Sequence, residues 1–207
     1  MFKYRLLCIT CPRQDMSYQK QAELACLGGA DMIQLRDKTL EGKALVKLAA
    51  ELQSITAAFG VPFVLNDNPE IAKEAGCSGA HIGQSDMPYE QARKLIPHGI
   101  VGVSAQNFEE AAEIAKTTAD YIGFGPVFDT PSKEGPKGTG IGELKRLVAA
   151  DFKMPVIAIG GIDESNVQDI MRAGADGAAV IRAVCGAPDI KTAAKRMKEL
   201  ITEAAIK

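Results

Sequence analysis

The stretch GGADMIQL, at residues 28–35, is one of four related stretches distributed along the chain. The others are GCSGAHIG at 76–83, TTADYIGF at 117–124 and GADGAAVI at 174–181. Each follows a segment of helical periodicity and begins a short apolar run, and its small residues suit the left-handed turn that ends many helices. The stretches recur about every 45 residues, the length of one βαβα unit, so four copies predict eight βα units.

Short apolar runs with the length of a β-strand alternate with longer segments of helical periodicity. The runs are Tyr4–Thr10, Met32–Leu35, Pro62–Leu65, Ala80–Ile82, Ile100–Val103, Tyr121–Phe124, Val156–Ile159 and Ala178–Ile181. They are apolar on both faces, as is typical of parallel strands buried on both sides. The pattern therefore predicts an α/β fold, a (β/α)8 TIM barrel formed by a single domain over residues 1–207.

Two other architectures are compatible with alternating strands and helices. A doubly wound open sheet would not favour eight equal units, and no G-x-G-x-x-G pattern follows the first run. Two domains would need a linker, and the Gly- and Pro-rich stretch FGPVFDTPSKEGPKGTGIG at 124–142 is the only candidate. We interpret this stretch instead as a long loop after the sixth strand, with glycines that permit hinge motion over a bound ligand.

Composition narrows the class of protein. The chain has 207 residues, of which 46% are hydrophobic and 24% charged, with a formal net charge of -2. This near-neutral balance argues against a nucleic-acid binder. The N-terminus lacks the apolar run of a signal peptide and no window resembles a membrane span, so we expect a cytoplasmic protein with no membrane partner. The sequence leaves open whether the chain forms a homo-oligomer.

The five cysteines are an odd number and are mostly scattered among apolar residues, which indicates reduced thiols. Cys8 and Cys11 form a C-x-x-C spacing. No second pair follows, and Cys8 lies inside an apolar run, so we interpret the spacing as chance packing and not as a zinc or redox site.

Carboxylates follow the third and fourth apolar runs. Functional side chains of such barrels follow the strands, and these two strands should be neighbours. Asp67 and Asp86 would therefore meet at one rim, where a Mg²⁺ ion would relieve their repulsion. Each could instead cap the helix that begins near Pro69 or Pro88.

Two further groups at the strand ends suit anions. Arg36 and Lys38 should point to the same side, and cations beside a metal suit a pyrophosphate, although both could be ordinary surface cations. Gly160 and Gly161 would expose backbone N–H groups to a phosphate at the start of the next helix, or would simply form a tight turn.

Other polar residues at the strand ends are Gln34, Asn66, Ser104 and Arg182. His81 lies within a run, and we interpret it as a hydrogen-bonded structural histidine. No Ser-His-Asp or Cys-His arrangement suggests itself. One metal site, one polyanion site and one phosphate site suit the displacement of a pyrophosphate leaving group, in which positioning and charge stabilisation provide most of the catalysis.

Six motifs, in order, now show a resemblance. QLRDK, ND, HIGQSD, GVS, YIGFGPVFDTPSK and AIGGI resemble the thiamine phosphate synthase (thiamine-phosphate pyrophosphorylase) family over nearly the whole chain. The resemblance implies a (β/α)8 barrel and a Mg²⁺-dependent transferase of thiamine biosynthesis. Such an enzyme joins hydroxymethylpyrimidine pyrophosphate to a thiazole phosphate, or its carboxylated form, through a dissociative pyrimidine-methyl cation. The products are thiamine phosphate and pyrophosphate.

The resemblance also implies roles for individual residues. The substrate-binding residues would be Gln34, Arg36, Lys38, Asn66, Ser104, Thr130, Pro131, Ser132, Lys133, Gly160, Gly161, Ile181 and Arg182. Of these, Arg36, Lys38, Ser104 and Lys133 would be catalytic, and Asp67 and Asp86 would bind Mg²⁺.

Some residues depart from the family pattern. Asp129 adds a negative charge near an anion site, Arg182 stands where many members carry Ser, and Cys11 where they often carry an acidic residue. A thiazole tautomerase-like paralogue would share the barrel, but that branch tends to carry a catalytic His where this chain has Pro126. Two further alternatives are a non-catalytic phosphate-ligand binding protein, against which the complete metal and cation set argues, and a different phosphate-handling barrel enzyme such as one of tryptophan biosynthesis. No Lys/Glu acid–base arrangement at the strand ends supports the latter.

Overall fold

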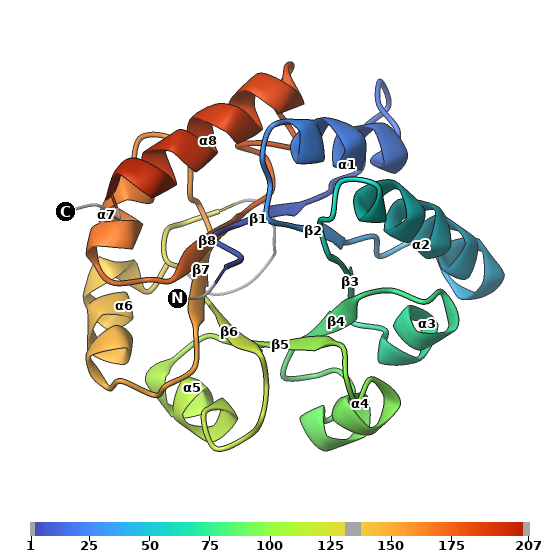
Figure 1. Cartoon of the computed structure of the whole chain (residues 1–207). Coiled ribbons are helices and arrows are strands. Elements are labelled where there is room, and N and C mark those ends of the chain that lie inside the picture. Colours follow the sequence, from blue (N-terminus) through green and yellow to red (C-terminus); the bar gives the residue numbers. More distant parts are fainter. Residues whose placement is uncertain (1–2, 131–137, 205–207) are drawn as a thin grey trace.

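The computed structural model describes residues 3–130 and 138–204. Parallel strands form a closed barrel in sequence order, and helices surround it (Figure 1). The strands are β1 (Leu6–Ile9), β2 (Met32–Leu35), β3 (Phe63–Asn66), β4 (Gly79–Ile82), β5 (Ile100–Ala105), β6 (Tyr121–Phe124), β7 (Val156–Ile159) and β8 (Gly177–Val180). The helices are α1 (Tyr18–Leu27), α2 (Gly42–Ala57), α3 (Pro69–Glu74), α4 (Tyr89–Leu95), α5 (Phe108–Ile114), α6 (Gly140–Ala149), α7 (Val167–Arg172) and α8 (Ile190–Ala204).

The barrel prediction is confirmed, and the open sheet is wrong. The decisive contact is the pairing of β1 with β8, in which Leu6 lies opposite Ala178 and Cys8 opposite Val180. This pairing leaves no free edge in the sheet. The stretch at 124–142 joins β6 to α6 within the barrel, so it is a loop and not a linker between domains.

Alternation along each strand divides the core into two layers. In β1, Leu7 and Ile9 belong to a cluster inside the barrel that also contains Met32 and Tyr121. Leu6, the neighbour of Leu7, belongs to the larger cluster between the strands and the helices. Both faces of each strand are therefore buried, which explains why the sequence shows continuous apolar runs and not a polar–apolar alternation.

The four related stretches share a hydrogen bond at the start of the barrel. Asp31, Ser78, Asp120 and Asp176 each immediately precede an even-numbered strand. Their side chains accept a backbone N–H from the preceding strand: Leu6 N to Asp31 Oδ2 (2.8 Å), Phe63 N to Ser78 Oγ (3.2 Å), Val101 N to Asp120 Oδ2 (2.8 Å) and Val156 N to Asp176 Oδ2 (2.9 Å). We call these four contacts the strand-start bonds. They join the strands in four pairs: β1 with β2, β3 with β4, β5 with β6, and β7 with β8.

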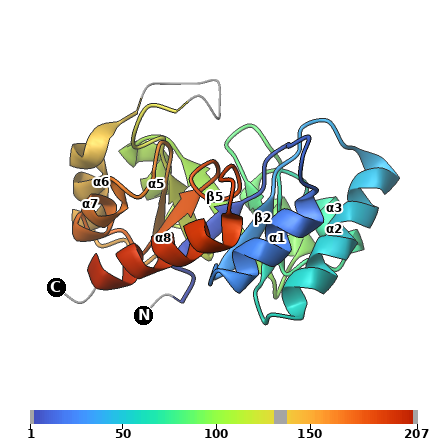
Figure 2. The same ribbon diagram turned by 90° about the horizontal axis from the view of Figure 1, so that it is seen from above.

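The strand-start bonds and the loops that follow the strands lie at opposite ends of the barrel. The strand-start bonds lie where the strands begin, and the loops that follow the strands gather at the other end (Figure 2). Within the described ranges, none of the helices has the length and apolar character needed to cross a membrane. The five cysteines, including Cys8 and Cys11, are free thiols.

Candidate active site

A cavity of about 520 Å³ opens at the carboxyl ends of the strands. Its lining includes many of the residues predicted from the sequence, namely Gln34, Arg36, Asn66, Ser104, Thr130, Gly160, Gly161, Ile181 and Arg182. These residues are far apart in the sequence and come together because parallel strands end at the same rim. Lys38 is exposed and does not line the cavity, whereas Pro131, Ser132 and Lys133 lie outside the described residues.

Gln34 reaches the cavity from the end of β2 and is almost fully buried, with 2% of its surface exposed. Its side-chain Nε2 has no hydrogen-bond partner among the described residues. A buried donor without an acceptor costs about 1–3 kcal/mol, so its position beside the cavity suits a ligand that supplies an acceptor.

Asp67 and Asp86 form a carboxyl pair beside the cavity. Asp67 follows β3 in a left-handed conformation (φ 66°), and its backbone N–H donates to the His81 carbonyl at 2.8 Å. Asp86 Oδ2 accepts the N–H of Gly83 at 2.6 Å. The two carboxyl groups are close enough to share a hydrogen bond. The sequence prediction that the ends of β3 and β4 bring these residues together is confirmed.

The pair has unusual electrostatics. Burial, followed by the hydrogen bond and the negative charge of Asp86, raises the pKa of Asp67 to about 6. Arg36 and Lys38 act in the opposite direction, which places both cations near the Asp67 carboxyl although only Arg36 lines the cavity. A divalent cation would relieve the repulsion that a bound proton relieves in acid.

The alternative that both aspartates cap helices is wrong. The residue at the N-cap of α3 is Asn68, and the one at the N-cap of α4 is Pro88. Neither aspartate therefore occupies the N-cap position of these helices. Among the described residues there is no group of three or more His, Cys, Asp or Glu side chains that could hold a metal. A pair of carboxylates completed by water and phosphate oxygens suits Mg²⁺, whereas zinc sites take three or four protein ligands.

Gly160 and Gly161 form a tight turn against the loop that follows β6. Both have left-handed backbones, with φ of 100° and 61°. A β-carbon on Gly160 would lie 2.5 Å from Pro126 Cα, so a side chain at this position would displace the loop. The prediction that these glycines start the next helix is wrong: α7 begins at Val167, after an intervening turn. Their role at the cavity therefore depends on close backbone approach and not on a helix terminus.

Asp129 has a structural partner in the same loop. Its Oδ1 accepts the backbone N–H of Gly138 at 2.8 Å, and the N–H of Gly140 donates to the Val127 carbonyl at 2.8 Å. We call these two contacts the loop neck, because they join the two ends of the segment between β6 and α6. Helix α6 begins at Gly140, earlier than the start near Glu143 that the sequence suggested.

The sequence missed several residues that line the cavity. Gln106 follows Ser104 at the end of β5, and Asp163 follows the glycine turn after β7. Their positions just beyond the strand ends were the available signal. His81 also lines the cavity, and its Nε2 lies 2.8 Å from Ser104 Oγ. The prediction of a hydrogen-bonded histidine is confirmed, but its position is not purely structural.

Comparison with known proteins supports the family that the sequence motifs resemble. A family model described as "Thiamine monophosphate synthase" matches residues 6–184. The chain belongs to this family. The thiamine-phosphate synthase of Methanoregula boonei is 44% identical over 191 residues, which cover 91% of this chain and 88% of that protein. The enzyme of the same name from Chloroflexus aurantiacus is 39% identical over 187 residues, covering 90% of this chain and 86% of that protein.

A solved structure of thiamine phosphate pyrophosphorylase from Pyrococcus furiosus is similar over 98% of this chain and 97% of its own length, with a TM-score of 0.90 and 33% identity. Membership of the thiamine monophosphate synthase family makes the chain a transferase of thiamine biosynthesis on a TIM barrel. It supports this assignment over the tautomerase-like and non-catalytic alternatives.

Proposed function

We propose that the chain condenses hydroxymethylpyrimidine pyrophosphate with a thiazole phosphate, or its carboxylated form, in a Mg²⁺-dependent reaction that yields thiamine phosphate and pyrophosphate, with CO2 as a further product from the carboxylated form. The observation that carries the proposal is the Asp67–Asp86 pair, which lies near Lys38 and near Arg36, a residue that lines the cavity. A metal site next to two cations suits a pyrophosphate group.

Each end of the cavity would take one substrate. At the β2 and β5 side, Gln34, Asn66 and Ser104 offer polar groups to the pyrimidine ring. At the opposite side, the backbone of Gly160 and Gly161 would hold the thiazole phosphate, with Thr130, Ile181 and Arg182 and with Pro131 and Ser132 from the segment outside the described residues. Lys133 would contact the pyrophosphate with Arg36 and Lys38.

Asp67 and Asp86 would hold Mg²⁺ in their ionised forms. When bound, this ion would neutralise negative charge that develops on the pyrophosphate as it leaves. The raised pKa of Asp67 means that metal binding must release the proton that the pair retains in acid.

The chain's own residues would mainly position and stabilise charge. The bond between the pyrimidine methylene carbon and the pyrophosphate oxygen breaks, and both electrons leave with pyrophosphate, toward Arg36, Lys38 and Lys133. The thiazole nitrogen then donates its lone pair to the methylene carbon. This nitrogen carries no proton, so the new bond forms without a general base. The loop after β6 would exclude water, which would otherwise trap the cation.

The test is a coupled pyrophosphate-release assay with and without Mg²⁺, in which thiamine phosphate is identified separately by oxidation to its fluorescent thiochrome derivative. We expect both products in equal amounts, and only when Mg²⁺ and both substrates are present. Pyrophosphate release without thiamine phosphate would indicate hydrolysis, and absence of both products would contradict the proposed reaction.

A further inference from the structure

Three polar side chains form a hydrogen-bonded chain inside the barrel. His81 of β4 lies between Tyr121 of β6 and Ser104 of β5. Its Nδ1 is 3.0 Å from the Tyr121 hydroxyl oxygen, and its Nε2 is 2.8 Å from Ser104 Oγ. Tyr121 is completely buried, whereas His81 and Ser104 line the cavity. These hydrogen-bonded side chains therefore lead from the barrel interior to the wall of the proposed pyrimidine site.

Two glycines make the space for this arrangement. Gly102 of β5 is the ladder partner of His81 on one side and of Tyr121 on the other. A β-carbon on Gly102 would overlap the Tyr121 ring, and one on Gly123 would lie 2.8 Å from His81 Cε1. The rings stack with centroids 5.5 Å apart. Interior positions of such barrels usually carry branched apolar side chains, so the two glycines create a slot for these rings.

The donor and acceptor roles in these hydrogen bonds depend on the tautomer of His81. Burial raises the pKa of the Tyr121 phenol, so the hydroxyl keeps its proton. In the arrangement that we infer, the Tyr121 hydroxyl donates to His81 Nδ1, so a neutral imidazole would carry its own proton on Nε2. Nε2 then donates to Ser104 Oγ. The Ser104 hydroxyl, which has accepted this bond, directs its proton into the cavity.

We infer that Tyr121 and His81 are positioning residues that fix the Ser104 hydroxyl as a hydrogen-bond donor toward an acceptor atom of the ligand, such as a ring nitrogen of a pyrimidine. The Ser104 backbone is held independently, because Gln84 Nε2 donates to its carbonyl at 2.6 Å. The hydrogen bonds of Tyr121 and His81 add control over the direction of the Ser104 hydroxyl proton. The kinetic consequence rests on the proposed function, whereas the tautomer of His81 does not.

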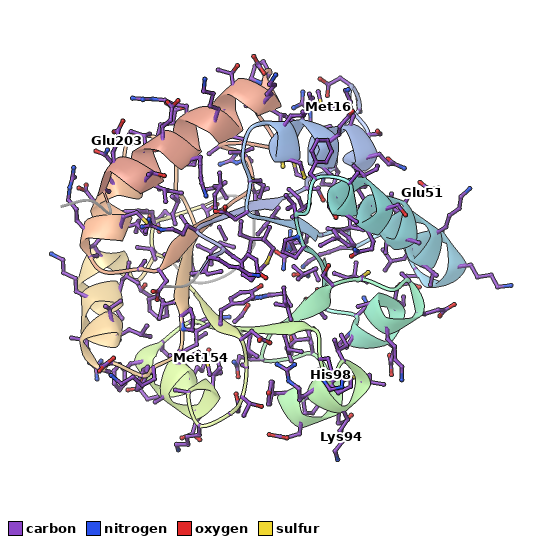
Figure 3. The ribbon with its side chains drawn as sticks, in the orientation of Figure 1. Met16, Glu51, Lys94, His98, Met154 and Glu203 are labelled. Carbon is purple, nitrogen blue, oxygen red and sulfur yellow. The ribbon has the colours of Figure 1, made fainter. Side chains whose placement is uncertain are left out.

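The first test measures the tautomer directly. The chain has two histidines, so ¹⁵N-histidine labelling of the untagged protein gives a spectrum of two rings. His98 lies on the outside of the barrel beside α4, and His98→Gln assigns its signals (Figure 3). We expect the His81 proton on Nε2, with Nδ1 shifted as a hydrogen-bond acceptor. Tyr121→Phe should remove that shift, and Ser104→Ala should move the Nε2 proton resonance upfield.

The second test measures coupling in the reaction. Tyr121→Phe keeps the ring that fills the slot and should lower kcat/KM by about 2- to 10-fold, the value of one hydrogen bond. Ser104→Ala should have a larger effect. The double variant should be no worse than Ser104→Ala alone, because Tyr121 acts only through Ser104. Unchanged circular dichroism and thermal unfolding would exclude a general loss of structure.

Three results would overturn the inference. They are a His81 proton on Nδ1 in the wild type, a Tyr121→Phe spectrum identical to the wild type, and additive kinetic effects in the double variant. If the wild-type protein makes no thiamine phosphate, the proposed function fails, but the spectra still decide the direction of the hydrogen bonds.

Discussion

Asp67 shows how its surroundings change the chemistry of one carboxyl group. Its pKa is raised from 3.8 to about 6, chiefly by burial and then by Asp86. The folded protein therefore holds this proton more tightly than the unfolded chain does. The contribution to stability is full below about pH 4 and is lost as the pH rises through about 6. Mg²⁺ would bind most strongly above that range.

Asp67→Asn should remove this pH dependence and the response to Mg²⁺. In the wild type, we expect Mg²⁺ to raise the melting temperature more at pH 7.5 than at pH 5, since proton competition lowers affinity about tenfold per pH unit below the pKa. Activity of the variant should fall by more than about 100-fold, because losing a group that merely supports a metal ligand costs about 10- to 100-fold. Thermal melts at both pH values check this, with Asp169→Asn as the exposed control. An unchanged Mg²⁺ response in Asp67→Asn would refute the metal assignment.

Asp129 can be tested with two substitutions that separate charge from hydrogen bonding. Asp129→Asn keeps an oxygen that accepts the Gly138 N–H but removes the negative charge beside the proposed phosphate site. Asp129→Ala removes both. We expect the Asn variant to keep or lower the KM for thiazole phosphate and the Ala variant to raise it about 2- to 10-fold. Initial rates at varied thiazole phosphate distinguish them, and equal KM values in both variants would show that the loop neck does not matter.

At the residue scale, the sequence predicted which side chains meet at the strand ends better than it predicted individual hydrogen-bond partners. The meeting of Asp67 and Asp86 followed from the ends of two adjacent strands, which topology alone determines. The partner of Asp129 could not be predicted, because it depends on how the loop folds back to Gly138. The hydrogen bonds of His81 required knowing that Gly102 and Gly123 leave space for two rings.

At the element scale, the turn after β7 holds the loop after β6 in place. Phe128 N donates to the Gly160 carbonyl at 3.0 Å, and Pro126 occupies the space that a β-carbon on Gly160 would need. The sequence predicted a phosphate cradle here but placed it at a helix start. The prediction placed it there because a glycine pair before an amphipathic segment resembles a helix N-terminus. In the structure, the residues before α7 form a separate turn.

Gly160→Ala should destabilise the protein and disturb this loop. Gly60 is a matched control, because its backbone is also left-handed (φ 68°) but a β-carbon there would meet nothing within 4 Å. Gly60→Ala should cost about 1–2 kcal/mol from backbone strain alone. Gly160→Ala should cost more, through its contact with Pro126, and should also raise the KM for thiazole phosphate. Urea unfolding and initial rates measure both effects. Equal costs, with KM unchanged, would show that the loop yields freely.

At the scale of the whole molecule, the repeated stretch explains why the barrel could be predicted. Each copy places a polar acceptor just before an even-numbered strand, and the strand-start bonds then fix the register of that strand pair. The period of the repeat was visible in the sequence. The hydrogen bonds were not, because they depend on which strand lies alongside. Closure between β1 and β8 followed from counting the units.

Asp176→Ala should separate stability from activity. Asp176 accepts the N–H of the buried Val156 at the end of the barrel opposite the cavity. Its loss should cost about 1–3 kcal/mol, because the donor is left without a partner. Asp169→Ala removes an exposed carboxylate paired with Arg172 at 3.0 Å and should cost no more than about 1 kcal/mol. Both variants should keep the wild-type kcat/KM. A large loss of activity in folded Asp176→Ala would mean that the two ends of the barrel are coupled.

The loop neck has a consequence for chain entropy. Asp129 is hydrogen-bonded to Gly138, and Val127 to Gly140. These two contacts already hold the ends of the intervening segment near each other. Closing a longer segment between fixed ends costs only about 0.6 kcal/mol for each doubling of its length. The barrel can therefore accept segments of different length and composition at this position with little loss of stability, so this loop can vary more freely than the scaffold that carries it.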